Sequence, residues 1–394
     1  MKKSITFCFY LFSITSWAQV TVSTITSEFK GSGALALDSL GNLHIADFGD
    51  SLGGPDADGI PNNILQLDTG LNLTTFSTGF IGASGNNFDN SGVLYQSDIW
   101  DNAIYKIVDG VRTFVTSDGI VSPVGIVFDS SDNFYVCNCG NNTIQKVTPS
   151  GVSSIFSSGG FYACPNGITI DEDDNLYITN FTNGNIIRLD MSGNASIIAN
   201  SAAGNGHIEY DPNTRNLYVA SFGGQQIFYI DIDDPEAIPL VGLAGVRGNE
   251  DGTSDVATFS NPNGIAVSKT GDSIYVNSAL PVTGGALNPQ YIRLITNVLS
   301  LSVEDNELLQ NLKVYPNPAA AYFVIEADLL DTFDDLHLIV RDLSGRIVIE
   351  MEGMEMTSNV LKTSVDISGL SAGNYFYSMS NGKQHLFTGQ MVKQ

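Results

Sequence analysis

Residues 171–180 read Asp-Glu-Asp-Asp-Asn-Leu-Tyr-Ile-Thr-Asn, an aspartate, a short turn and an alternating strand that ends on a polar residue. The chain contains six copies of this pattern, whose equivalent aromatic or His positions lie 51, 40, 42, 41 and 57 residues apart. Self-similarity at about 40 residues, with strand-like content in each copy, is typical of a β-propeller. The copies are Asp38–Asp47, Asp89–Asp98, Asp129–Asn138, Asp171–Asn180, Asp211–Ser221 and Ser268–Ser278, and the equivalent positions are His44, Tyr95, Tyr135, Tyr177, Tyr218 and Tyr275.

The sequence around the quoted stretch predicts four strands in one repeat. β-Branched and polar residues alternate between turns rich in Gly, Asn and Asp, which is the pattern of half-buried antiparallel strands. The expected strands are 167–171, 175–180, 185–190 and 195–199. The neighbouring repeats show the same pattern, so each repeat is expected to form one four-stranded blade.

The last repeat contains only three expected strands, Gly264–Ser268, Ser273–Asn277 and Tyr291–Thr296. The segment Val20–Thr26 precedes the first repeat and has no partner there. Pairing of this segment with the last repeat would close the ring and remove two exposed sheet edges. The sequence therefore predicts an all-β fold, a six-bladed β-propeller over 19–300 that is closed by an N-terminal strand.

Details of the repeats resemble NHL-repeat and gluconolactonase-like propellers. The nearest match is 244–252 followed by 257–267, which contains Asn261-Pro262-Asn263-Gly264. The resemblance implies the fold but not the function, because propellers host unrelated activities. Long insertions at 48–62, 246–261 and 279–290 are expected on one face of the ring, where a binding site is the favoured interpretation. Tolerated variation of surface loops is the alternative.

The C-terminal segment from Leu312 has a different strand pattern and its own motifs. It resembles the C-terminal sorting domain of proteins exported by the type IX secretion system of Bacteroidota. That resemblance implies a small β-sandwich recognised by the export machinery, whereas an ordinary adhesion-type sandwich is the alternative. The residues that carry the resemblance are Tyr315, Pro316, Asn317, Pro318, Gly345, Arg346, Gly373 and Tyr375.

The N-terminus has the pattern of a secretory signal peptide that the Sec machinery would bind. Lys2 and Lys3 precede an apolar run at 5–14 and a small-residue cleavage site at 16–18. No other segment is apolar enough to suggest a transmembrane span. The expected organisation is a signal peptide at 1–18, the propeller at 19–300, a linker at 301–311 and the sorting domain at 312–394. The mature protein is expected in the medium or attached to the outer-membrane surface, after passage through the periplasm.

The formal net charge of −25 restricts the class of partner. So acidic a surface repels nucleic acid and anionic membranes, and we expect neither as a partner. Besides the two export machineries, the expected partner is an extracellular glycan, protein or small molecule.

Three cysteines remain after signal removal, and an exported protein can form disulfides. Cys139 and Cys164 are expected on the same face of adjacent blades, so they are the favoured pair. Cys137 is the alternative partner, because residues two apart in a strand share a face. Three unpaired core cysteines are a further alternative.

Three Asn-Gly pairs occupy equivalent positions where the first strands begin, at Asn166, Asn205 and Asn263. The resemblance to gluconolactonase-like propellers implies a divalent metal in this region, bound by carboxylates together with asparagines. However, none of the six equivalent positions carries Asp or Glu, and a hard cation generally needs a carboxylate. The favoured interpretation is that Asn-Gly makes a tight turn into the strand.

A second candidate metal site is a calcium loop in the insertion of the first repeat. Asp50, Asp56 and Asp58 lie close together, with Gly59 at a turn. Alternating carboxylates around a glycine are the ligand pattern of Ca²⁺ loops. A solvated acidic loop is the alternative.

No complete catalytic set is evident in the sequence. Only His207 of the four histidines is expected near the axis, and it is more readily explained as a satisfied polar group than as a base. The favoured hypothesis is therefore an exported, non-enzymatic recognition propeller. The alternative is a metal-dependent gluconolactonase-like hydrolase, with Asp47 or Asp98 completing the metal shell of Asn166 and Asn263.

Overall fold

The computed structural model describes residues 20–201, 204–281, 286–298, 309–329, 336–342, 347–354, 356–357, 359–380 and 385–394. The predicted signal peptide, most of the predicted linker, and Gly345 and Arg346 of the sorting motif lie outside these ranges. Within them the regular elements are all β-strands. No helix in the described part of the chain is long and apolar enough to cross a membrane.

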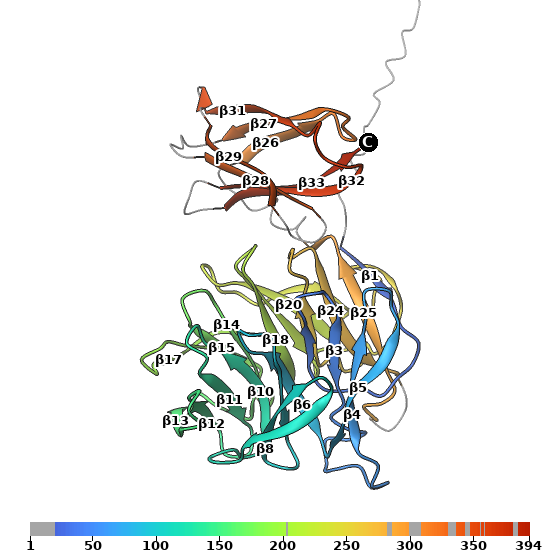
Figure 1. Cartoon of the computed structure of the whole chain (residues 1–394), viewed down its shortest axis with the longest axis vertical. Coiled ribbons are helices and arrows are strands. Elements are labelled where there is room, and N and C mark those ends of the chain that lie inside the picture. The colour runs from blue at the N-terminus through green and yellow to red at the C-terminus, as the bar shows by residue number, and fades with distance from the viewer. Residues whose placement is uncertain are drawn as a thin grey trace, which may run out of the picture.

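Six antiparallel sheets form the blades of the propeller, with strands a to d from the axis outward, and in blades 1 to 5 these strands follow chain order. Figure 1 shows the blades arranged around a common axis. Blade 1 is β2 (Leu35–Leu37), β3 (Leu43–Ala46), β4 (Asn62–Leu67) and β5 (Leu73–Phe80). Blade 2 is β6 (Ala83–Phe88), β7 (Leu94–Asp98), β8 (Ala103–Val108) and β9 (Val111–Thr116). Blade 3 is β10 (Pro123–Phe128), β11 (Phe134–Asn138), β12 (Thr143–Val147) and β13 (Ser153–Ser158).

The next two blades repeat this arrangement. Blade 4 is β14 (Pro165–Ile170), β15 (Leu176–Asn180), β16 (Asn185–Leu189) and β17 (Ala195–Asn200). Blade 5 is β18 (Asn205–Asp211), β19 (Asn216–Ser221), β20 (Gln226–Asp231) and β21 (Ile238–Val241).

Blade 6 is completed by the first described strand of the chain. It contains β23 (Ile265–Val267), β24 (Ser273–Ala279) and β25 (Gln290–Thr296), and β1 (Thr21–Thr24) pairs with β25 as its fourth strand. Strand β23 lies beside β2 of blade 1, so the ring is closed. The prediction of a six-bladed propeller closed by an N-terminal strand is confirmed. A short fifth strand, β22 (Gly252–Thr253), pairs with the outer edge of β1 and was not expected.

A glycine lies just before or within strand a of every blade, and neighbouring blades meet at these positions. A Cβ built on any of them would lie no more than 2.6 Å from a backbone atom of the next blade. None of the six has a positive φ, so the requirement is for space rather than for a special turn. The Asn-Gly pairs therefore reflect the close approach of blades more than a tight turn. The glycines are Gly33, Gly85, Gly125, Gly167, Gly206 and Gly264.

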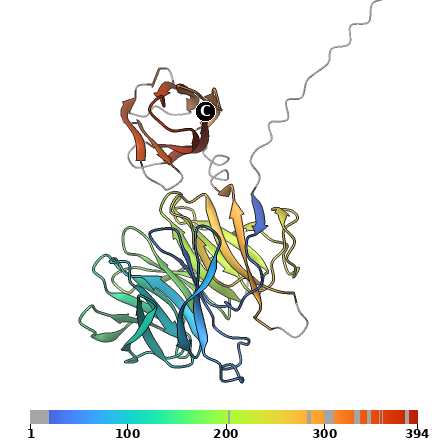
Figure 2. The same ribbon diagram turned by 45° about the vertical axis from the view of Figure 1, so that its right-hand side comes forward.

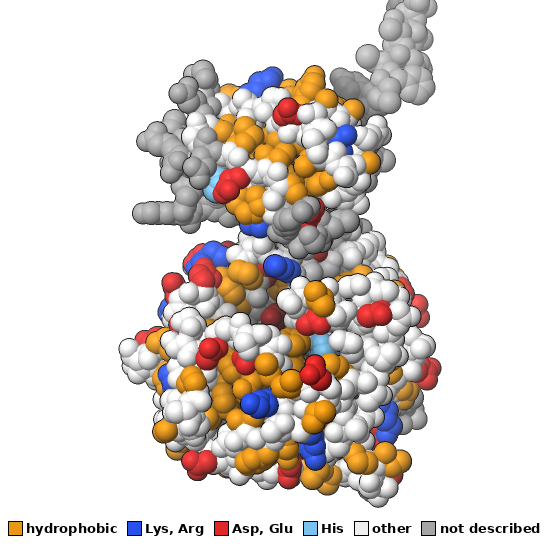
Figure 3. All heavy atoms as spheres, in the orientation of Figure 1, with side chains coloured by type: hydrophobic (Ala, Val, Ile, Leu, Met, Phe, Trp, Pro, Cys, Tyr) orange, Lys and Arg blue, Asp and Glu red, His pale blue; other side chains and the backbone are white. Residues whose placement is uncertain are grey.

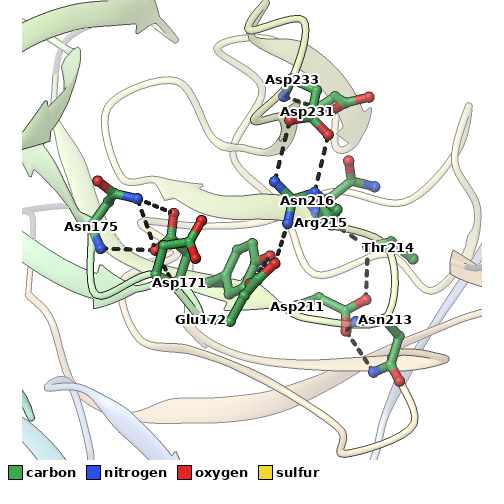
Figure 4. Close-up of polar contacts among 12 residues, drawn as sticks. Asp171, Glu172, Asn175, Asp211, Asn213, Thr214, Arg215, Asn216, Asp231 and Asp233 are labelled. Carbon is green, nitrogen blue, oxygen red and sulfur yellow. Dashed lines mark hydrogen bonds and ion pairs between the residues drawn. The ribbon is translucent and has the colours of Figure 1, made fainter. Parts of the chain in front are cut away.

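The quoted repeat stabilises the turn between strands a and b. The Asp171 carboxylate accepts hydrogen bonds from the backbone N–H of Asp173 (3.0 Å) and Asn175 (2.8 Å) and from the Tyr177 hydroxyl (3.0 Å). Figure 4 shows this turn beside the equivalent turn of blade 5, whose Arg215 forms an ion pair with Glu172 of the blade 4 turn. The aspartate and the aromatic residue of the repeat are thus explained by one hydrogen-bonded turn.

The C-terminal residues form a β-sandwich with its own core, and Figures 1 and 2 show it as a separate body. One sheet has the order β26 (Leu309–Tyr315), β27 (Tyr322–Leu329), β31 (Val360–Asp366) and β30 (Met356–Thr357). The other has the order β29 (Ile347–Met354), β28 (Leu336–Asp342), β32 (Gly373–Ser380) and β33 (His385–Lys393). The prediction of a small C-terminal β-sandwich is confirmed.

Candidate functional site

In each blade, one residue directly follows the terminal polar residue of the repeat copy, at the end of strand b and on the face that carries the b–c loops. Five of these six residues line a single cavity at the mouth of the channel. Four of the five are apolar or aromatic, and the fifth is a disulfide cysteine. They are Phe48, Ile99, Cys139, Phe181 and Phe222, and the sixth position is Ala279.

The cavity has a volume of about 300 Å³ and an uncharged lining. Its inner side consists of residues that directly precede the blade-contact glycines, namely Ser84, Val124, Asn166 and Asn263. None of the described residues that line it carries a charge. An apolar cavity with a few converging polar groups is the usual form of a small-molecule site. We call this cavity the mouth pocket.

Two aromatic pairs face each other across the mouth pocket from opposite blades. Phe48 and Trp100, of blades 1 and 2, have ring centroids 5.7 Å apart. Phe181 and Phe222, of blades 4 and 5, also have centroids 5.7 Å apart. Both pairs are tilted by about 55°, which leaves ring faces and edges available to a ligand.

Two of the three long insertions meet beside the mouth pocket. The backbone N–H of Leu287, from the blade 6 insertion, donates to the carbonyl oxygen of Asp50 in the blade 1 insertion (3.0 Å). The amide of Asn288 also donates to the Asp47 carboxylate (3.0 Å) and the Asp50 carboxylate (3.1 Å). The third insertion, 246–261, instead contributes β22 at the outer edge of blade 6.

The three asparagines of the candidate channel metal occupy different environments. Asn166 and Asn263 line the mouth pocket, and their Nδ2 atoms donate to the carbonyl oxygens of Asn205 (3.1 Å) and Ser32 (2.7 Å). Asn205 is fully buried, where it donates to Gly184 and accepts from the Ser201 hydroxyl. The structure thus brings two of the three together and gives the third a structural role.

The polar residues that end the b strands hold the loops that lead into strand a. The Asp98 carboxylate accepts hydrogen bonds from the backbone N–H of Ile81 (2.8 Å) and Gly82 (2.9 Å), and Asn180 accepts from Ala163 (3.1 Å). Burial raises the pKa of both Asp47 and Asp98. Neither carboxylate lines the mouth pocket. The described residues contain no cluster of three or more His, Cys, Asp or Glu side chains arranged for a metal ion.

The candidate calcium loop is only partly assembled. The Asp56 carboxylate accepts a hydrogen bond from the backbone N–H of Asp50 (2.7 Å). The Asp50 carboxylate is held by Lys30 (3.2 Å) and Asn288, and the exposed Asp58 accepts from its own loop at Ile60. A calcium ion would have to displace the Lys30 ammonium, so calcium binding here stays a prediction.

The cysteines lie at the border of blades 3 and 4. Cys139 and Cys164 form a disulfide with an S–S distance of 2.00 Å, and both line the mouth pocket. Cys137 is buried and free, and burial raises the pKa of its thiol. The disulfide therefore ties the b–c loop of blade 3 to the start of blade 4 on the pocket side.

Two of the three insertions lie on the expected face, beside the mouth pocket, but the aromatic lining of that pocket was not predicted. One sequence feature could have indicated this lining. In four of the six blades the residue that follows the repeat copy is a large apolar one, Phe48, Ile99, Phe181 or Phe222. Trp100 and Leu287 have no such signal, because each lies in an irregular loop.

The described residues of the sorting motif cluster at one end of the C-terminal sandwich. Asn317 accepts a hydrogen bond from the backbone N–H of Val392 (2.9 Å), so the motif is tied to the C-terminal strand β33. Tyr315 is partly exposed at the end of β26, and Pro316 and Pro318 flank Asn317. Gly373 begins β32, on which Tyr375 is buried.

Family comparisons identify both parts of the chain. Residues 313–394 match the family described as secretion system C-terminal sorting domain, and residues 121–147 match the NHL repeat. The chain thus carries an NHL repeat within its propeller and a type IX sorting domain at its C-terminal end. The sorting domain supports export to the cell surface or the medium. No curated protein matches the chain.

Solved structures similar to this chain are propellers with low sequence identity. An auxiliary nutrient binding protein from Bacteroides thetaiotaomicron has a TM-score of 0.57 and 12% identity, covering 70% of this chain and 76% of its own. Its counterpart from Bacteroides ovatus has a TM-score of 0.56 and 13% identity, covering 71% and 76%. A gluconolactonase from Xanthomonas campestris has a TM-score of 0.52 and 13% identity, covering 71% and 91%. At these identities the likeness establishes the fold alone.

Proposed function

We propose that the chain is an exported, non-enzymatic binding propeller that captures a neutral small ligand in the mouth pocket. The observation that carries the proposal is the uncharged lining of that pocket, with an aromatic pair on either side and amide and hydroxyl groups between them. Such a pocket offers no counter-ion to a charged ligand, which would lose hydration without compensation. A neutral sugar ring fits this chemistry, because its C–H face packs on aromatic rings and its hydroxyls pair with Asn and Ser.

The comparisons support this proposal at the level of function class. Two of the similar propellers are nutrient binding proteins from Bacteroides species. The sorting domain supports delivery to the cell surface or the medium, where nutrient capture would occur. The proposed signal peptide at 1–18 would bring the chain to the periplasm first.

Calorimetric titration of the purified chain with neutral mono- and oligosaccharides tests the proposal, with a sugar acid of the same ring as a matched ligand. We expect binding of a neutral sugar and at least tenfold weaker binding of the acid. Trp100→Ala and Phe181→Ala should each weaken binding roughly tenfold, since an aromatic contact contributes about 0.5–1.5 kcal/mol beyond its buried area. Phe114→Ala is the control, because Phe114 is exposed on the outer strand β9.

Binding that survives both pocket substitutions would contradict the proposed site. Absence of binding to every neutral sugar, with the acid bound instead, would contradict the proposed ligand class.

The second candidate function is a metal-dependent gluconolactonase-like hydrolase, favoured by the position of Asn166 and Asn263 in one pocket. Metal analysis after equilibration with calcium, magnesium and zinc, with lactone hydrolysis measured in parallel, separates the two functions. Stoichiometric metal and activity that are both lost in Asn166→Ala would favour the hydrolase. Metal lost only when Asp56 and Asp58 are replaced would assign it to the calcium loop and leave the binding propeller as the proposed function.

A further inference from the structure

A second and larger cavity opens on the opposite face of the propeller, between blades 1 and 6. Its volume is about 680 Å³, and the a–b turns Asp38–Gly41 and Ser268–Thr270 form its rim. Figure 3 shows a hollow, with acidic side chains around it, in the propeller face turned to the viewer. The inner end of the cavity reaches the a strands of blades 2 and 5 at Asn86, Asn87 and Glu209. We call it the rear cavity.

Polar atoms without partners converge at the inner end of the rear cavity. The Oδ1 atom of Asn86 is buried and has no hydrogen bond, and only 6% of the residue is exposed. The Nε2 atom of His207, 7% exposed, is also without a partner in the adjoining lumen, which Asn86 and Glu209 line as well. A buried polar atom without a partner costs free energy, and such sites commonly accept a ligand group or a water molecule.

Among the described residues that line this inner end, Glu209 is the only acidic one. No hydrogen bond or ion pair to its carboxylate is found among the described residues. Burial, together with the nearby Asp211 carboxylate, raises the pKa of Glu209 to about 8. Burial also lowers the pKa of His207 to about 4, so the imidazole is neutral and supplies no positive charge.

The other titratable groups around Glu209 leave its charge uncompensated. Its register partner on β19 is Tyr218, and the described strands β14 and β23 packed against β18 carry no ionisable side chain. At the rim, the Asp38 carboxylate accepts hydrogen bonds within its own turn, and Lys269 is exposed. A ligand cation would therefore meet an unpaired acceptor.

The walls between the rim and the inner end are largely apolar. Leu35, Leu37, Ala266, Val267 and Tyr275 line this part of the cavity. A single metal ion would leave most of the volume unfilled, and the described residues hold no three-ligand cluster for one. The lining suits a molecule with an apolar body and one positively charged end.

We propose that the rear cavity binds an organic amine, whose ammonium group pairs with Glu209 and Asn86 while its apolar part lies along Leu35 and Val267. The ammonium donates the hydrogen bonds that these acceptors lack, and the carboxylate supplies the opposite charge. This site shares no lining residue with the mouth pocket, so we expect its occupancy to be independent of the proposed sugar binding.

Titration of the purified full chain with n-hexylamine, and with n-hexanol as the neutral counterpart, tests the proposal. We expect the amine to bind and the alcohol to bind at least tenfold more weakly. Protons compete with the ammonium group for Glu209, so affinity should be roughly 30-fold higher at about pH 9 than at about pH 6.5. Glu209→Gln should abolish this pH dependence and weaken amine binding at least tenfold.

Glu236→Gln makes the same chemical change on an exposed residue and should leave binding unchanged. Circular dichroism and thermal melting establish that Glu209→Gln is folded, and Trp100→Ala should retain amine binding. Equal affinities for amine and alcohol, unchanged binding in Glu209→Gln, or displacement of the amine by micromolar zinc or calcium would each overturn the proposal.

Discussion

At the scale of single residues, the propeller depends on positions where a side chain has no room. The blade-contact glycines allow the a strands to approach one another at the axis, and Gly167 is representative. A Cβ at this position would lie 2.6 Å from the Cα of His207, which is backbone and cannot rotate away. The strictest sequence requirement of the fold is therefore for small size at the axis.

Gly167→Ala should destabilise the protein by about 1–3 kcal/mol, because overpacking at a rigid contact shifts the backbone. Urea denaturation followed by tryptophan fluorescence measures this change. Gly160→Ala is the matched control, since a Cβ there would meet nothing within 4 Å. Equal stabilities of the two variants would contradict the steric explanation.

Glu209 makes stability depend on pH in the direction opposite to that of most acidic residues. The pKa of Glu209 in the folded protein is about 8, well above that of an unfolded glutamate. At pH values between these two pKa values, the folded state therefore binds one more proton than the unfolded state. The contribution of Glu209 to stability should be fully present below its unfolded pKa and should be lost as pH rises toward 8. The slope contributed by this group is at most about 1.4 kcal/mol per pH unit.

Glu209→Gln should therefore flatten the stability profile between about pH 5 and pH 8 and raise the melting temperature above pH 8. Thermal melts of both proteins across this range provide the comparison. The opposite result would be a wild-type melting temperature that rises between about pH 5 and pH 8, together with a difference from Glu209→Gln that does not change with pH. That result would show that Glu209 is ionised normally.

At the scale of elements, ring closure depends on one carboxylate beside strand β1. Asp251 accepts hydrogen bonds from the Thr24 backbone N–H (3.0 Å) and hydroxyl (2.9 Å), and from Arg293 (2.9 Å). Arg293 has no exposed surface and also donates to the carbonyl oxygens of Glu250 and Thr258. The loop before blade 6 thus joins the first strand of the propeller to the last.

Asp251→Ala should destabilise the protein by about 1–3 kcal/mol, because a buried guanidinium loses its charged partner. Hydrogen exchange should accelerate at β1 and β22 before the other blades respond. Asp118→Ala, at an exposed aspartate in the blade 2–3 loop, is the control. If hydrogen exchange instead accelerated equally in all blades, β1 would not open separately from the rest of the propeller.

At the scale of the whole molecule, the propeller and the sandwich have separate cores. The buried residues of the sandwich core lie within 319–391, with Leu312 and Val314 packed against them, and the buried residues of the other core clusters lie within 20–298. We propose that 19–300 and 312–394 fold independently and that 301–311 is a linker between them. Limited proteolysis should release a propeller that melts within a few degrees of its transition in the intact chain. A large loss of stability on cleavage would contradict independent folding.

The sequence predicted the fold well because the repeat encodes a turn, a strand and a blade in one stretch. It predicted the position of β1 because blade 6 lacked a strand. The mouth pocket was not predicted, because Phe181 and Phe222 each follow a repeat copy but resemble core aromatics in sequence, and they become neighbours only when blades 4 and 5 pack side by side. Strand β22 was missed for a similar reason, since two residues in a loop carry no periodicity.

Closure by β1 has a consequence for biogenesis. The first strand of the ring to leave the ribosome pairs with β25, which is among the last, so blade 6 cannot form until nearly the entire propeller has been synthesised. Until then β1 remains without its partner strand, and unpaired edges promote association with other chains. On the proposed route through the periplasm, nascent propellers should therefore depend on chaperones there for a period set by the translocation time of some 270 residues, from Thr24 to Arg293.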